Sequence, residues 1–284
     1  MKFYQNLDLT DYNSYKIKSI AKNAFFPESV EDIKWLMGNI SNPIFIGGGN
    51  NIILSKNYYE EENFIIFREN FSDITIENET VTCLSGVDLK ELSLIALENN
   101  LSGLEIYFDI PGTVGGAVVM NAGAQGEDFS QLLQEVTILD NKTGELKIIK
   151  GEEIGYSYRN SLFQNQSNII VIEAKLKLKK STRDIILEKM ETTEANRHKK
   201  QPREYPNAGS VFKRPKGFYV GPLIESLGLK GYTIGGAMIS TKHAGFIVNK
   251  GNATGEDIIE LINYIKSAVW SNCKVNLEVE QKII

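Results

Sequence analysis

Apolar residues recur at helical spacing in several segments of the chain. The clearest pattern runs from Thr254 to about Ser271, where apolar residues three or four positions apart define one buried face. A second long pattern begins at Ser181 and is expected to end at Pro202, because proline cannot continue a helix. We interpret this second helix as the connector between two larger units. Further helices are expected to begin at Ser29, Asp88 and Pro222.

Short apolar runs between these segments predict strands. The predicted strands are 43–46, 52–54, 64–67, 74–76, 81–84, 136–139, 146–149 and 275–279. Another strand is predicted where Ala174, Leu176 and Leu178 alternate with lysines. Residues 101–126 lack periodicity and predict a long loop. A loop of that length is uncommon in a compact domain unless it carries function.

Composition narrows the class of protein. The chain has 284 residues, a net charge of -5 and 24% charged residues, which argues for an enzyme in solution and against nucleic acid as the main partner. Cys83 and Cys273 form no disulfide framework, and His198 and His243 lack ligand spacing, so no metal site is expected. No apolar run reaches membrane-helix length and no signal-peptide core is present, so we expect a cytoplasmic protein without membrane contact.

Glycines follow the buried strand at 43–46. The residues are Gly47, Gly48, Gly49, Asn50 and Asn51. Glycines at this place let successive backbone amides approach a phosphate, although a simple tight turn is the more frequent outcome for an isolated segment. The dinucleotide-binding fingerprint is absent, because Ile52 occupies its third glycine position.

The predicted loop at 101–126 gives stronger evidence for cofactor binding than residues 47–51 do. Six glycines lie between residues 103 and 126, and each loses about 0.5–1 kcal/mol of conformational freedom relative to alanine on folding. A purely structural loop has little reason to keep so many, whereas a backbone cradle for a flat phosphorylated cofactor does. The candidate cofactor-binding residues here are Pro111, Gly112, Thr113, Gly115, Gly116, Ala117, Asn121, Ala122 and Gly123.

These segments occur in order with others further along the chain. Residues 110–117 followed by 121–124 resemble the flavin loop of the UDP-N-acetylenolpyruvoylglucosamine reductases, and residues 47–51 resemble the first flavin-phosphate loop of that family. The resemblance continues at 158–163, 206–213, 223–231, 235–249 and 277–280. The short distance between Arg159 and Ser210 resembles the subclass that lacks an inserted substrate loop. Two departures are the missing Gly-Gly pair at 13–20 and Arg214, where the family commonly has Asn.

The resemblance implies an α+β architecture and a domain order. It implies a vanillyl-alcohol-oxidase/PCMH-like FAD-binding fold of two units, 1–56 and 57–180, then a connecting helix at 181–202 and a C-terminal α/β substrate-binding domain at 203–284. The final strand is expected to return to the active site. A monomer is expected.

The resemblance also implies an activity. In this family NADPH reduces bound FAD, and the flavin passes hydride to UDP-N-acetylglucosamine enolpyruvate. Arg159 would stabilise the enolate-like charge, Ser210 would donate the proton to carbon, and Glu280 would donate a hydrogen bond if burial raises its pKa. Tyr158, Lys200, Lys213 and Arg214 are carried over as substrate-binding residues, and the basic run 197–200 is a further candidate for a phosphate.

Other interpretations of these residues remain open. Without the resemblance, Arg159 would be a surface ion pair, Ser210 a turn residue and Glu280 part of a solvated edge strand. A flavin oxidase of the same fold acting on another small alcohol is the alternative enzyme. A flavin- or UDP-sugar-binding protein without turnover is the alternative outside enzymes.

Overall fold

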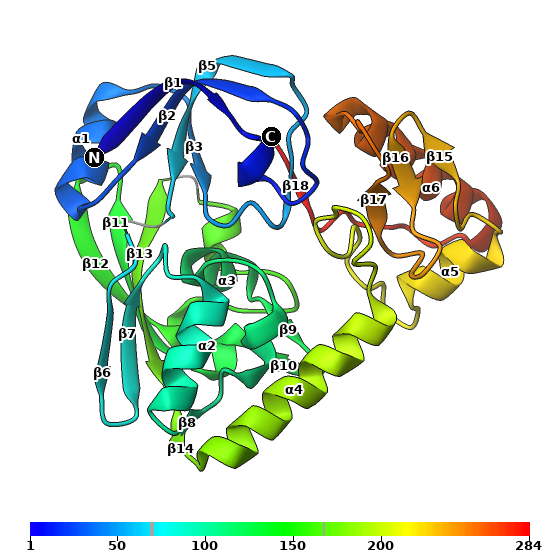
Figure 1. Ribbon diagram of the computed structural model, residues 1–284. Helices are drawn as coiled ribbons and strands as arrows, with labels where there is room; N and C mark the ends of the chain where they lie inside the picture. The colour runs from blue at the N-terminus through cyan, green and yellow to red at the C-terminus, as the bar shows by residue number, and fades with distance from the viewer. Residues whose placement is uncertain (69–70, 167) are drawn as a thin grey trace. The chain divides into compact units, whose positions relative to one another are not determined.

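The structure is a computed structural model that describes residues 1–68, 71–166 and 168–284 (Figure 1). The α-helices of this described part are α1 (Val30–Asn39), α2 (Leu89–Glu98), α3 (Val114–Met120), α4 (Arg183–Lys200), α5 (Val220–Ser226) and α6 (Gly255–Cys273). Short 3-10 helices are η1 (Thr10–Tyr12), η2 (Glu105–Asp109), η3 (Phe129–Gln131), η4 (Gly151–Glu153) and η5 (Leu162–Gln164).

The strands form several small and two larger sheets. One larger sheet has the order β1-β2-β5-β3, with β1 (Lys2–Asp8), β2 (Ile20–Phe26), β5 (Tyr58–Ile66) and β3 (Pro43–Ile46). The other has the order β12-β11-β13-β7-β6, with β12 (Glu145–Lys150), β11 (Leu133–Asp140), β13 (Ile169–Lys177), β7 (Thr80–Leu84) and β6 (Ile74–Glu77). The smaller sheets are β15-β16-β17 (Thr233–Ile234, Ala237–Ile239, Ile247–Asn249), β10-β9 (Glu127–Asp128, Gly123–Ala124), β14-β8 (Lys179–Lys180, Leu101–Ser102) and β18-β4 (Lys282–Ile283, Ile52–Ile53).

The helix starts expected at Ser29, Asp88 and Thr254 are confirmed by their caps, whereas α5 begins at Val220, two residues before the expected Pro222. Ser29 accepts a hydrogen bond from the Asp32 amide at 3.1 Å, so α1 begins where the polar signal predicts. Asp88 caps α2 in the same way. Thr254 and Asp257 form a reciprocal capping box at the start of α6.

Two further expectations about local structure are wrong. The predicted loop at 101–126 contains α3, which Thr113 caps. Its two glycines are poor helix formers and hide it from periodicity arguments. The predicted strand at 275–279 is reduced to an isolated bridge between Phe212 and Val279. Its partner segment cannot extend the ladder, because Pro215 has no amide hydrogen and Gly209 has a φ of 80°.

The chain divides into two compact units. Unit 1 comprises 1–4, 24–48 and 62–197, and unit 2 comprises 5–23, 49–61 and 198–284. Each unit is therefore built from segments distant in sequence. The residue boundaries expected at 56, 180 and 202 remain a prediction.

Unit 1 is organised around β13, both faces of which are covered. Val171 and Ala174 join the apolar core formed with α2 and α3. Ile170 and Ile172 belong to a second apolar core together with Ile33 of α1. This double burial explains the continuous apolar run at 169–172.

In unit 2 the helix α6 covers the β15-β16-β17 sheet. Its buried residues are Gly255, Ile258, Leu261, Ile262, Ile265 and Val269, which confirms the face predicted from spacing. Within residues 1–68, 71–166 and 168–284, every helix is too short or too polar to traverse a lipid bilayer.

The Thr254 cap provides a test of how α6 is stabilised. We expect Thr254→Ala to lower the free energy of unfolding by about 1 kcal/mol, because the Asp257 amide loses its acceptor. Urea unfolding followed by circular dichroism measures this change. Thr254→Ser keeps the hydroxyl and is expected to be nearly neutral; equal losses in both variants would contradict the role of the cap.

Candidate active site

The two glycine segments adjoin within unit 1. Gly47 lies directly against Thr113, so that a Cβ at position 47 would overlap Thr113 Oγ1. Thr113 is buried, and its hydroxyl also caps the amide of Gly116 at 3.4 Å. Only a residue without a side chain permits this approach at position 47.

The second segment runs beside the residues that connect β7 to α2. Gly115 donates its amide to Ser85 O at 2.8 Å, and the Leu89 amide donates to Gly112 O at 3.0 Å. A Cβ at Gly115 would lie 2.8 Å from Ser85 Cβ. Ser85 Oγ is buried, and no atom of the described residues forms a hydrogen bond with it. A buried hydroxyl in this state can be stabilised by a polar ligand atom.

The remainder of the first glycine segment belongs to unit 2 and contacts the N-terminal part of the chain. Gly49 has a φ of 69°, and a Cβ there would overlap the Tyr12 carbonyl oxygen. The Ser14 amide donates to Gly49 O at 3.0 Å, and Asn50 Nδ2 donates to Ser14 Oγ at 2.7 Å. The segment that departs from the family pattern thus supports the loop directly.

Arg159 is held in an unusual backbone conformation beside the second glycine segment. Its φ is 54°, a region that costs a non-glycine residue on the order of 1–3 kcal/mol and that is frequent at functional sites. The guanidinium donates to Asn121 O at 3.2 Å and to Gly123 O at 2.7 Å. It also lies 5.5 Å from the ring centroid of Tyr158. Both acceptors are backbone carbonyl oxygens of the second glycine segment, so Arg159 is tied to that segment directly.

Ser210 and Glu280 lie in unit 2 on segments that pair with each other. The Glu280 amide donates to Val211 O at 2.8 Å, next to the Phe212–Val279 bridge. Ser210 is exposed and Glu280 is half-buried. Asn51 Nδ2 donates to Glu280 O at 3.2 Å, so unit 2 brings the first glycine segment and Glu280 together.

A set of buried, hydrogen-bonded side chains contacts the backbone just before Ser210, and it was not identified from sequence. Tyr15 OH donates to Gln281 Oε1 at 2.9 Å, and Gln281 Nε2 donates to Ala208 O at 2.9 Å. Asn249 Nδ2 donates to Tyr15 O at 2.8 Å. Burial raises the pKa of Tyr15, so its phenol stays protonated and keeps donating. No periodicity marks these residues, because they lie far apart along the chain.

The expected substrate-binding residues have varied surroundings. Lys213 Nζ lies 2.7 Å from Glu278 Oε1, and the Arg214 guanidinium lies 3.8 Å from the ring centroid of Tyr219. Lys200 is exposed at the last residue of α4, and Tyr158 is exposed as well. Their predicted roles in substrate binding remain predictions.

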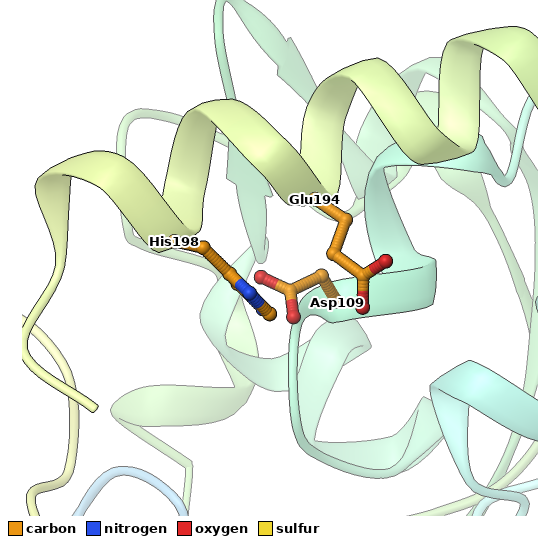
Figure 2. Close-up of side chains that lie close together, drawn as sticks. All are labelled: Asp109, Glu194 and His198. Carbon is orange, nitrogen blue, oxygen red and sulfur yellow. The ribbon is translucent and has the colours of Figure 1, made fainter. Parts of the chain in front are cut away.

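Three side chains that sequence analysis did not connect lie close together at α4 (Figure 2). The possible ligand atoms of Asp109, Glu194 and His198 lie within 4.8 Å of one another. The Arg197 guanidinium donates to Asp109 Oδ2 at 2.7 Å, so a protein cation already lies against this carboxylate. The absence of a metal site remains an expectation.

Known proteins resemble both parts of the chain. Residues 22–150 match the family described as the FAD binding domain. Residues 201–284 match the family described as the UDP-N-acetylenolpyruvoylglucosamine reductase, C-terminal domain.

Similarity to individual proteins extends over nearly the whole chain. The UDP-N-acetylenolpyruvoylglucosamine reductase of Francisella tularensis subsp. tularensis is 38% identical, over 98% of this chain and 99% of the relative. That of Fervidobacterium nodosum is 41% identical, over 99% and 91%. The crystal structure of the Thermus caldophilus reductase has a TM-score of 0.85 at 31% identity, over 100% of this chain and 99% of the other. The chain therefore belongs to the UDP-N-acetylenolpyruvoylglucosamine reductase family.

Proposed function

We infer that the protein catalyses the NADPH-dependent reduction, through bound FAD, of UDP-N-acetylglucosamine enolpyruvate to UDP-N-acetylmuramate. It is an oxidoreductase of peptidoglycan precursor synthesis. The conclusion rests on the similarity of nearly the whole chain to reductases of this name, at 38% and 41% sequence identity. The flavin oxidase of the same fold is thereby set aside.

The glycine segments fit an FAD. Gly47 and Gly115 lie where a Cβ would overlap a neighbour or press against it, and Ser85 Oγ supplies a buried hydroxyl that a polar cofactor atom could satisfy. The residues expected to hold the cofactor are those of 47–51, 111–113, 115–117 and 121–123. When bound, FAD supplies the hydride chemistry, and the chain supplies position and electrostatic field.

We propose three residues for the chemistry at the substrate. Arg159 binds the carboxylate on which negative charge develops, and its fixed guanidinium suits two parallel hydrogen bonds. Ser210 gives a proton to carbon. The backbone of Glu280 forms hydrogen bonds with Val211 O and with Asn51 Nδ2. Its carboxyl group, in the protonated form, donates a further hydrogen bond to the substrate.

Several finer points are also proposals. We propose that Tyr158, Lys200, Lys213 and Arg214 contact the UDP-sugar, which requires Lys213 to exchange Glu278 for a phosphate. We further propose a monomeric cytoplasmic enzyme with FAD-binding subdomains at 1–56 and 57–180, a connecting helix at 181–202 and a substrate-binding domain at 203–284. The negative net charge supports a small-molecule partner rather than nucleic acid.

The first experiment is an anaerobic visible spectrum of the purified protein. Flavin bands are expected to bleach on addition of NADPH and to return on addition of UDP-N-acetylglucosamine enolpyruvate. Bands that return only with oxygen would favour an oxidase. A protein that binds no flavin even with added FAD would contradict the proposed function.

The close approach of Gly115 to Ser85 predicts that the variant Gly115→Ala binds less flavin. In Gly115→Ala the new methyl group meets Ser85 at 2.8–3.0 Å, so the segment must shift, at a cost of about 1–3 kcal/mol. We expect the flavin content of the purified protein, measured at 450 nm, to fall several-fold. Gly38→Ala is the matched control, because position 38 lies in α1 with no atom within 4 Å of the added Cβ. Full flavin content in Gly115→Ala would show that this approach is not required.

The role of Ser210 predicts a selective kinetic defect. Ser210→Ala is expected to keep the rate at which NADPH reduces the flavin. Turnover of the enolpyruvyl substrate should fall by about 10²-fold or more, because a positioned proton donor is lost. Stopped-flow absorbance separates the two half-reactions. Ser226→Ala removes an exposed hydroxyl from α5 and serves as the control; unchanged turnover in Ser210→Ala would disprove the assignment.

A further inference from the structure

Helix α4 packs against the residues that lead into the second glycine segment. Its buried residues Ile186, Met190 and Thr193 recur three or four positions apart, and Arg197 continues the same face. Ile186 and Met190 form an apolar cluster with a residue of α2, and Phe108 of η2 packs against this cluster. The apolar contact thus joins α4 to η2, which ends at Asp109, two residues before Pro111.

A charged contact lies at the C-terminal end of this interface. Arg197 Nε donates to Asp109 Oδ2 at 2.7 Å, and its Nη2 donates to the Asp109 carbonyl oxygen at 3.4 Å. The two side chains are only 15% and 7% exposed. Partial burial makes the loss of one partner costly, because the other charge is left in a poorly solvated place. The structure assigns Arg197 to this carboxylate rather than to a ligand phosphate.

A second charged contact lies two turns earlier on α4. Lys189 Nζ lies 3.5 Å from Glu105 Oε2 and 3.0 Å from Glu127 Oε1. The Glu105 side chain is 1% exposed, and Ser102 and the Gly103 amide also donate to it. Its buried charge therefore has both hydrogen bonds and a nearby cation.

These contacts reach both ends of the second glycine segment. Asp109 and Glu105 precede residues 111–123, whereas Glu127 follows them. Lys189 and Arg197 are separated by about 12 Å along a helix that rises 1.5 Å per residue. Through Lys189 and Arg197 one helix therefore contacts acidic residues both before and after the segment.

We propose that Lys189 and Arg197 are positioning residues that hold residues 111–123 in the shape that binds FAD. The proposal rests on the proposed function, since it assigns these residues to retention of that cofactor. Neither side chain is required to touch substrate. Their loss should weaken FAD binding while leaving the turnover of enzyme that still holds FAD largely intact.

The test is FAD release from the purified holoenzyme. Diluted holoenzyme releases flavin, which is followed by the rise in flavin fluorescence. We expect Arg197→Met to raise the dissociation constant for FAD about ten-fold, because a partly buried charge pair is broken. Turnover with saturating FAD should stay within about two-fold of wild type. Arg197→Lys should restore part of the affinity, since it keeps the charge but loses the planar fork.

Two further variants keep the result interpretable. Arg183→Met removes an exposed charge from the first residue of α4 and should leave FAD release unchanged. Lys189→Met tests the other contact if Arg197→Met does not fold, and should weaken FAD binding as well. Wild-type FAD retention in Lys189→Met and Arg197→Met would overturn the inference. A wild-type protein that holds no flavin would overturn the proposed function, and this inference with it.

Discussion

The close approach of Gly47 to Thr113 is the constraint on which the rest of the candidate site depends. A single methyl group at position 47 would overlap the Thr113 hydroxyl, so the two glycine segments can adjoin only without a side chain there. Thr113 in turn caps α3, and α3 places Gly115 against Ser85. Steric exclusion at a few glycines therefore fixes the backbone of the two glycine segments, and contacts with the surrounding elements hold that backbone in place.

These supporting contacts join segments distant in sequence. In unit 1, α4 contacts η2, which leads into the second glycine segment, through Phe108 and through the Arg197–Asp109 ion pair. In unit 2, Tyr15, Gln281 and Asn249 form a buried hydrogen-bonded group that supports the backbone beside Ser210 and Glu280. A low-dielectric interior strengthens such bonds and makes each unsatisfied partner costly, so these groups favour one arrangement.

The sequence predicted many local features of the fold. The caps at Ser29, Asp88 and Thr254 and the buried face of α6 are confirmed, because they depend on residues only a few positions apart. Helix α3 was not predicted, because it contains Gly115 and Gly116, and glycine is a poor helix former. Gly115 instead permits the close approach to Ser85. The strand at 275–279 was overpredicted, because a strand forms only if its partner can pair with it.

The sequence by itself determined the family, through ordered glycine and polar motifs, and with it the cofactor and reaction. Which residues support the site was decided only by tertiary structure. The left-handed backbone of Arg159, the contact of Ser14 with Gly49, and the Arg197–Asp109 pair each join residues with no common periodicity. The physical reason is that periodicity records which face of one element is buried, whereas hydrogen bonds and ion pairs between elements depend on the folding of the whole chain.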